Sequence, residues 1–177
     1  TLSTGNVYKN LNFTGFAGTV AFAATTHTMY GNLTLGTSRA YTQTGGLLSL
    51  GANTLSTGIY SNSSGNTPSV SLSAGGNIVI TGNATTVLTL SSATNVNSVP
   101  ISLTYSGATG TRSITGGSNP TNPPVVTIPA GTDTVSLTAT ASCFASLGLT
   151  GFGGTLTTSS TTYNFNVTQN AATTVTI

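Results

Sequence analysis

The segment Asn53-Thr-Leu-Ser-Thr-Gly58 joins a polar turn residue, a short apolar strand and a glycine. Three other segments of the first half have this layout, and the four begin 22, 21 and 24 residues apart. In a β-solenoid one such unit recurs in every coil, and each coil buries its inward side chains against the next. A solenoid is therefore one interpretation of the first half, and the other is that a chain so rich in a few small polar residues produces such matches by chance. The other segments are Asn10-Leu-Asn-Phe-Thr-Gly15, Asn32-Leu-Thr-Leu-Gly36 and Asn77-Ile-Val-Ile-Thr-Gly82.

The composition of the 177 residues predicts an all-β protein. Thr, Ser, Gly and Asn number 39, 22, 22 and 16, and there is no Glu. Thr and Val suit strands because branching at Cβ restricts χ1, whereas Gly and Asn suit the turns between strands. Glu, Lys and Gln, which would cover an exposed helical face, are almost absent.

The second half alternates apolar and polar residues with a period of two, which marks strands with one face inward. Segments rich in Pro and Gly at 116–124 and 151–154 separate these strands, as in an antiparallel sandwich. We therefore expect an Ig-like antiparallel β-sandwich in the C-terminal half. The N-terminal half is then either β-solenoid-like or further strands of the same sandwich. The expected divisions are an assembly strand at 1–15, a Thr/Gly/Asn-rich β region at 16–95 and the sandwich at 96–177. The alternating residues are Val99, Ile101, Leu103 and Tyr105; Val135, Leu137 and Ala139; Tyr163, Phe165 and Val167; and Val175 and Ile177.

Two segments of the second half resemble the Ig-like and Calx-beta-like repeats of bacterial surface proteins: Val99-Pro-Ile-Ser-Leu-Thr-Tyr-Ser-Gly107 and Val126-Thr-Ile-Pro-Ala-Gly-Thr-Asp-Thr-Val-Ser-Leu-Thr138. The resemblance implies strand–turn–strand units of a sandwich. Calx-beta modules can hold calcium through clustered carboxylates, and this chain departs from them because Asp133 is its only acidic side chain. The uncharged composition also looks like that of thread and pilus subunits of archaea and bacteria, which implies assembly into filaments.

The chain has too few charged side chains for most acid–base enzymes. Paired carboxylates cannot exist with one Asp and no Glu, and no metal-ligand spacing, nucleophile elbow or phosphate loop occurs. Three isolated basic residues cannot follow a phosphate backbone, and no apolar stretch is long enough for a membrane helix. We therefore expect no enzymatic activity, no metal, no cofactor, no nucleic-acid partner and no transmembrane segment. The charged residues are Lys9, Arg39, Arg112 and Asp133.

Two covalent features are expected candidates. Lys9 could form an isopeptide bond with an Asn, with loss of ammonia, promoted by Asp133 as the nearby acid. The alternative is a solvated lysine and an aspartate in a hairpin turn. Five Asn-x-Ser/Thr sequons are candidate glycosylation sites, as in secreted proteins. The sequon residues are Asn12, Asn32, Asn62, Asn83 and Asn166, with Asn62 in the most loop-like stretch of the first half.

Two terminal segments are candidate assembly strands. Val7, Leu11 and Phe13 fall on one face of an N-terminal strand, and Val175 and Ile177 alternate at the other end. An alternating terminal strand can complete a sheet in the next subunit, with main-chain hydrogen bonds giving strength. The alternative is that both segments are ordinary strands of their own fold.

The sequence thus predicts a structural subunit of an extracellular or cell-surface filament that self-assembles by β-strand complementation between subunits. Its partners would be copies of itself in a helical homopolymer, and covalent glycans. The alternative is a carbohydrate-binding or adhesive module of a larger surface adhesin or phage fibre, and an enzyme is the weakest of the three hypotheses. Because residue 1 is Thr rather than Met, we expect either a removed leader or a start inside a longer protein.

Overall fold

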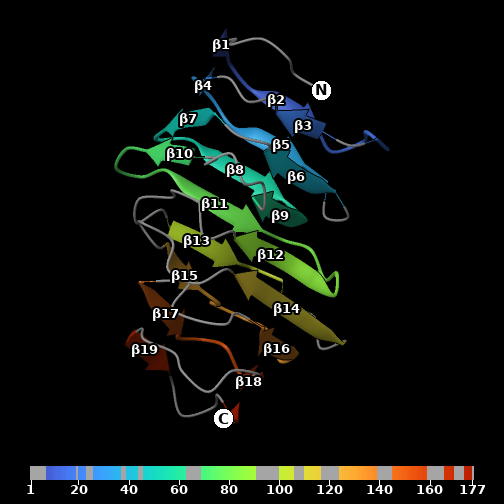
Figure 1. Cartoon of the computed structure of the whole chain (residues 1–177), viewed down its shortest axis with the longest axis vertical. Helices are drawn as coiled ribbons and strands as arrows, with labels where there is room; N and C mark the ends of the chain where they lie inside the picture. The colour runs from blue at the N-terminus through green and yellow to red at the C-terminus, as the bar shows by residue number, and fades with distance from the viewer. Residues whose placement is uncertain are drawn as a thin grey trace.

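In the computed structural model, every element is a β-strand and every strand pair is parallel among the described residues. The strands stack along the long axis of the molecule, with the N-terminus at one end and the C-terminus at the other (Figure 1). The chain therefore forms a β-solenoid. The structure describes residues 7–18, 20–22, 26–36, 39–43, 46–62, 69–90, 100–105, 110–116, 124–138, 145–158, 166–169 and 174–176.

Two long sheets, here called sheet 1 and sheet 2, run the length of the solenoid and contain eight strands each within the described part of the chain. Each coil contributes one strand to each long sheet. Sheet 1 consists of β2 (Leu11–Phe13), β5 (Leu33–Leu35), β8 (Thr54–Thr57), β11 (Asn77–Ile80), β13 (Pro100–Leu103), β15 (Val125–Thr127), β17 (Ser146–Leu149) and β19 (Asn166–Gln169). Sheet 2 consists of β3 (Val20–Phe22), β6 (Ala40–Gln43), β9 (Ile59–Asn62), β12 (Thr86–Leu90), β14 (Thr111–Gly116), β16 (Thr134–Leu137), β18 (Thr155–Thr158) and β20 (Thr174–Thr176).

A third sheet, sheet 3, covers the N-terminal coils in the described part of the chain. Its four strands within the described residues are likewise parallel. They are β1 (Val7–Tyr8), β4 (His27–Met29), β7 (Leu47–Gly51) and β10 (Ser69–Leu72).

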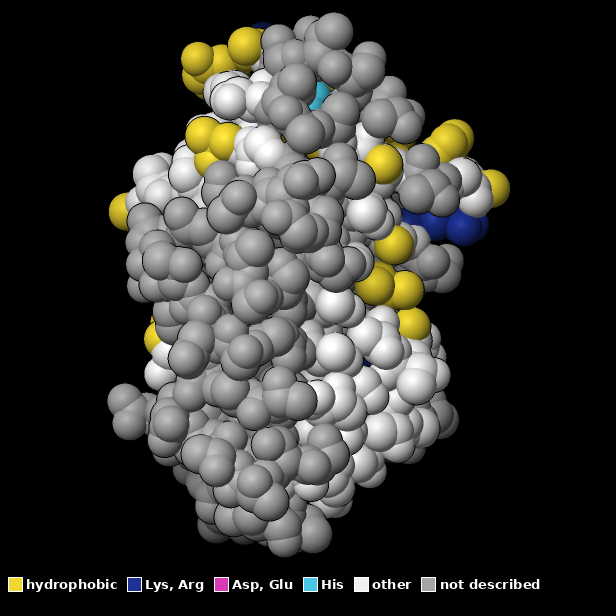
Figure 2. Space-filling model, viewed as in Figure 1, with side chains coloured by type: hydrophobic (Ala, Val, Ile, Leu, Met, Phe, Trp, Pro, Cys, Tyr) yellow, Lys and Arg dark blue, Asp and Glu magenta, His cyan; other side chains and the backbone are white. Residues whose placement is uncertain are grey.

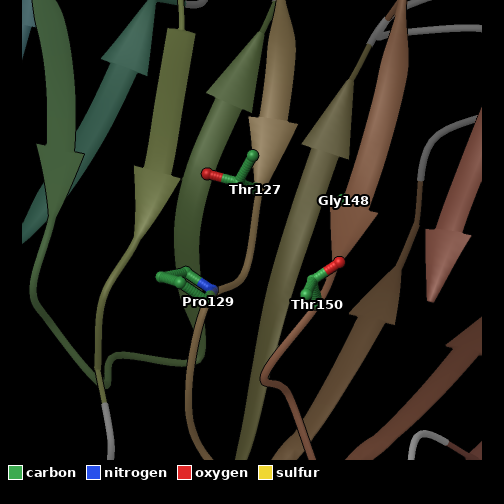
Figure 3. A pocket seen from close by; sticks show the side chains of 4 residues that line it. All are labelled: Thr127, Pro129, Gly148 and Thr150. Atoms are coloured by element: carbon green, nitrogen blue, oxygen red, sulfur yellow. The ribbon is translucent and has the colours of Figure 1, made fainter. Parts of the chain in front are cut away.

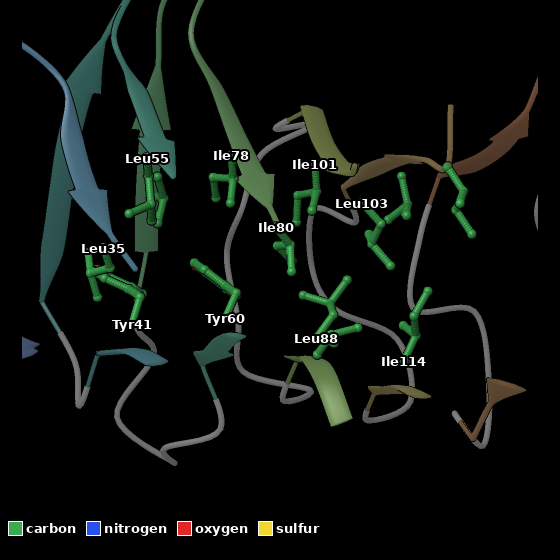
Figure 4. Close-up of a cluster of buried hydrophobic side chains, with 14 of the residues drawn as sticks. Leu35, Tyr41, Leu55, Tyr60, Ile78, Ile80, Leu88, Ile101, Leu103 and Ile114 are labelled. Carbon is green, nitrogen blue, oxygen red and sulfur yellow. The ribbon is translucent and has the colours of Figure 1, made fainter. Parts of the chain in front are cut away.

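The core lies between sheets 1 and 2 and is built from in-register columns. Leu33, Leu55, Ile78 and Ile101 are aligned by the pairing of their strands and are all fully buried. Figure 4 shows side chains of sheet 1 facing those of sheet 2 across this core. Strands β5, β8 and β11 alternate buried and partly exposed residues, so the period of two identifies which side chains fill the solenoid there.

The expected antiparallel sandwich over 96–177 is wrong. The alternating segments of that half do form strands, but Ile101 pairs in parallel with Ile78, and Val135 pairs in parallel with Arg112 and Leu156. Alternation reports that one face of a strand is buried, and it carries no information on the direction of the neighbouring strand. A solenoid is one of the two arrangements that the sequence leaves open for the first half; it is the arrangement found, and it continues through the second half. Tyr163, Phe165 and the segment at 91–97 lie outside the described residues.

Polar side chains tie successive coils together at the turns. The Asn10 Oδ1 accepts a hydrogen bond from the Asn32 amide at 2.8 Å, and the Asn32 Oδ1 accepts one from the Thr54 amide at 3.0 Å. These contacts span 22 residues each, and the next, from the Thr54 hydroxyl to Asn77 Oδ1, spans 23. The repeated Asn therefore bonds to a neighbouring coil as well as suiting the turn: Asn10 and Asn32 bond to the following coil, and Asn77 to the preceding one. Outside this ladder, Thr57 donates its hydroxyl to the Arg39 carbonyl of the preceding coil.

Aromatic rings fill the N-terminal part of the core. Tyr41 and Tyr60 are fully buried and stack with centroids 5.3 Å apart and planes 14° apart. Phe22 contacts Tyr41 at 5.4 Å and His27 at 5.0 Å. The Tyr41 hydroxyl donates to Gln43 Oε1 at 2.9 Å. Burial raises the pKa of Tyr41 well above its ordinary value of 10.0, and Tyr60 adds to the shift.

We expect the free energy of unfolding to fall in alkaline solution because of Tyr41. Its side chain ionises near pH 10.0 when the chain is unfolded, whereas the raised pKa keeps the folded side chain protonated. The folded state then binds more protons, so stability present below that pH is lost above it, by up to about 1.4 kcal/mol per pH unit. Urea unfolding between about pH 8 and 12 measures the slope. Tyr41→Phe should flatten it, and an unchanged slope would contradict the assignment.

Candidate assembly interface

The N-terminal end of the solenoid exposes apolar side chains. Val7 of β1 is 67% exposed, Phe16 is 49% exposed and Tyr30 is 72% exposed. The Phe16 ring lies 6.1 Å from the ring of Phe13, which packs against the core. Figure 2 shows hydrophobic side chains at several separate places in the upper half of the view, over the N-terminal coils. This end therefore offers an apolar rim beside the edge strand β2.

Strand β2 also offers main-chain hydrogen-bonding groups. Within the described residues it pairs with β5 on one side only. The Leu11 amide donates to the Asn32 carbonyl at 2.9 Å, so it faces β5. Main-chain groups of successive residues in a strand point to opposite sides, and the Asn12 amide therefore points to the free edge. At the other end of sheet 1, β19 pairs only with β17 among the described strands.

The structure places the predicted assembly residues in different surroundings. Val7 is exposed, whereas Leu11 and Phe13 are half-buried and pack against the core. Val175 lies in β20, where it pairs with Leu156 of β18. Ile177 lies outside the described residues. Among the described residues, β2 and β20 are edge strands of the solenoid itself.

The sequon residues are distributed along the solenoid. Asn12 and Asn32 are exposed, and their Oδ1 atoms accept hydrogen bonds from the Thr14 and Thr54 amides. Asn83 is exposed and donates to the Tyr105 hydroxyl at 3.4 Å. The structure describes only the backbone of the other two: Asn62 ends β9 and Asn166 begins β19.

The structure does not bring Lys9 and Asp133 together. Lys9 is exposed just before β2, and Asp133 precedes β16. Five steps of the sheet order separate β2 from β15, in the coil of Asp133, which is about 24 Å at the usual strand spacing. Asp133 instead pairs with Arg112, and both side chains are fully buried.

The Arg112–Asp133 ion pair was not predicted from the sequence. Arg112 Nη2 donates to Asp133 Oδ1 at 3.1 Å, and Nε donates to Oδ2. The guanidinium carbon lies 5.2 Å from the centroid of the Tyr105 ring. A signal was present, because the two residues lie 21 residues apart, which is about one coil of the repeat.

A shallow groove lies on the outer face of sheet 1. It has a volume of about 300 Å³ and is lined by Thr127, Pro129, Gly148 and Thr150 (Figure 3). Gly148 pairs with Thr127, and a Cβ on Gly148 would lie 3.2 Å from the Thr127 methyl carbon. The missing side chain therefore opens the groove, whose walls carry hydroxyls and no titratable group.

Metal ligands do not cluster in the described part of the chain, where no group of three or more His, Cys, Asp or Glu side chains could hold an ion. The same residues contain no helix long and apolar enough to cross a membrane. Comparison with known protein families, characterised proteins and solved structures finds no match to the chain. A function for the chain is therefore inferred from the geometry of the ends and faces of the solenoid.

Proposed function

We propose that the chain is a structural subunit of an extracellular filament, in which the edge of one solenoid pairs with the opposite edge of the next. The observation that carries the proposal is the edge of β2 on the side away from β5, where no other described strand pairs with it and to which the Asn12 amide points. Unpaired strand edges add further strands readily, because the exposed N–H and C=O groups template the next strand.

The geometry of the two ends favours an open filament over a closed dimer. The strands at both ends of sheet 1 have the same direction, since all pairs between them are parallel. Head-to-tail contact would therefore add further parallel strands to sheet 1. Heterologous contacts of this kind propagate into filaments unless the rotation closes a ring. The apolar rim of Val7, Phe16 and Tyr30 adds hydrophobic area to this contact.

Few repulsive forces oppose the contact. The sequence has a net charge of +2, so subunits repel one another weakly. Lys9 is the charged side chain nearest the β2 edge in sequence, and it is exposed. Assembly should therefore respond little to salt.

Proline at position 12 tests the edge directly. Asn12→Pro removes the amide that points to the free edge and leaves the Leu11 amide bonded to Asn32. We expect the full chain to form regular filaments by electron microscopy, and Asn12→Pro to leave mostly single particles. Sedimentation gives the fraction assembled, which we expect to fall at least about tenfold if one edge hydrogen bond of about 1.5 kcal/mol is lost per contact.

The matched control is Asn12→Ala. This substitution also removes the side-chain oxygen that accepts from the Thr14 amide, but it keeps the main-chain donor. Filaments should therefore persist in Asn12→Ala. Equal assembly by the proline variant, or monomers in the unmodified chain, would overturn the proposal.

The groove on sheet 1 supports a second candidate, an adhesive module that binds a carbohydrate. Its hydroxyls on Thr127 and Thr150 could hydrogen-bond a sugar, and Pro129 supplies an apolar wall. Gly148→Val would fill the groove. A monomeric chain whose glycan binding is lost in this variant would favour the adhesive module over the filament.

A further inference from the structure

An array of hydroxyl side chains covers the outer face of the C-terminal half of sheet 2. Strands β14, β16 and β18 each carry the pattern Thr-x-Ser or Thr-x-Thr, with the middle residue buried and the outer two at the surface. Strand pairing aligns these positions in two columns without a register shift. One column is Thr111, Thr134 and Thr155, and the other is Ser113, Ser136 and Thr157.

The columns are held in place from inside the solenoid. The residues between the hydroxyls are Arg112, Val135 and Leu156, all of them buried, so the intervening side chains anchor the face. Next to the array, the hydroxyl oxygens of Thr115 in β14 and Thr138 just after β16 lie 2.8 Å apart. This pair is a third place at which hydroxyls of neighbouring coils lie side by side. The backbone of β20 continues the same register beside β18, with Thr174 paired to Thr155 and Thr176 to Thr157.

The array carries no charge. Of the four charged residues in the sequence, Arg112 and Asp133 are buried and paired inside the core, and Lys9 and Arg39 belong to the N-terminal coils. Figure 2 shows the flank over β14 and β16, at the lower right of the view, as mostly white, which is the colour of uncharged polar groups and backbone. The face can therefore order water without competing ions.

We propose that this face binds ice through its ordered hydroxyl array. Neighbouring strands lie about 4.8 Å apart, and residues two apart on one strand lie about 6.6 Å apart. Water oxygens on the prism faces of hexagonal ice also form a rectangular net, with one repeat close to the strand spacing and the other somewhat longer than the spacing along a strand. Hydroxyls on such a net can replace surface waters, while the threonine methyl groups favour ordered water beside them. Because the columns are preorganised by the solenoid, the ordering entropy of binding is small.

A crystalline polysaccharide is the competing ligand for such a hydroxyl surface. Sugar binding usually employs an aromatic platform, and none of the array residues is aromatic. The uniform spacing and the lack of aromatic rings therefore favour ice over polysaccharide. The proposal is independent of filament formation, since the array lies on a face and the assembly edge lies at an end.

Ice binding can be measured with the full chain and ice itself as the probe. We expect the unmodified chain to shape growing crystals and to lower the freezing point below the melting point, and dye attached at the exposed Lys9 should enter the growing ice. Ser136→Lys and Thr157→Lys place a charged side chain in the array and should abolish most of this freezing-point gap. Ser71→Lys on sheet 3, where Ser71 is exposed, is the matched control and should retain it.

Several results would overturn the proposal. They are exclusion of the unmodified chain from ice, full activity in both array variants, and binding to cellulose or chitin powder in place of ice. Circular dichroism should show that the lysine variants keep the sheet content of the unmodified chain. Asn12→Pro should still bind ice, so failure of filament assembly and failure of ice binding are separate results.

Discussion

Replacing Asp133 with asparagine is expected to lower the free energy of unfolding by about 3–5 kcal/mol. The carboxylate accepts two hydrogen bonds from Arg112, and both side chains are fully buried. Asparagine is close in size but uncharged, so the guanidinium would remain in the core without a counter-charge. The Tyr105 ring, 5.2 Å from the guanidinium carbon, supplies only about 1–2 kcal/mol of cation–π attraction.

Urea unfolding followed by circular dichroism measures the effect of Asp133→Asn. Because each coil contacts only its neighbours in a solenoid, amide exchange in Asp133→Asn should rise first in β14, β16 and β18, the strands around the ion pair. The control is the double variant Arg112→Met with Asp133→Leu, which removes both charges and should recover most of the stability, because apolar replacements of buried pairs are often neutral. A loss below about 1 kcal/mol in Asp133→Asn, as for an exposed pair, would contradict the buried ion pair.

Ile78→Ala is expected to cost about 2–5 kcal/mol, because it removes a side chain from the centre of the core. Ile78 is fully buried and pairs with Leu55 on one side and Ile101 on the other. The cavity would lie between two coils, and the strands around it are fixed by ladders on both sides. The surroundings can therefore relax only partly into the space.

The matched control for Ile78→Ala is Val79→Ala on the same strand. Val79 points outward and is partly exposed, so its truncation should cost less than about 1 kcal/mol. Both values come from urea unfolding monitored at the same wavelength. Equal losses at the two positions would contradict the inward orientation of Ile78 and the register that aligns it with Leu55.

The sequence determined the all-β class and the period of the coils. The recurrence of an Asn, a short apolar strand and a Gly in the first half corresponds to coils whose Asn10 and Asn32 bond to the next coil across 22 residues. Alternation at Ile101 and Leu103, or at Val135 and Leu137, also identified buried residues correctly. These features are local, because side-chain period and turn chemistry follow from the backbone geometry of a single strand.

Only the tertiary structure decided the direction of the strands and the partners of the charged residues. A strand with one buried face has the same alternation in a sandwich and in a solenoid, so the second half could not be assigned from its pattern. Arg112 and Asp133 meet because each coil brings the chain back beside the equivalent strand of the preceding coil. The same geometry places Lys9 in the first coil. Likewise, the columns of Thr and Ser on sheet 2 depend on register, which is a property of the pairing between strands and is absent from any one of them.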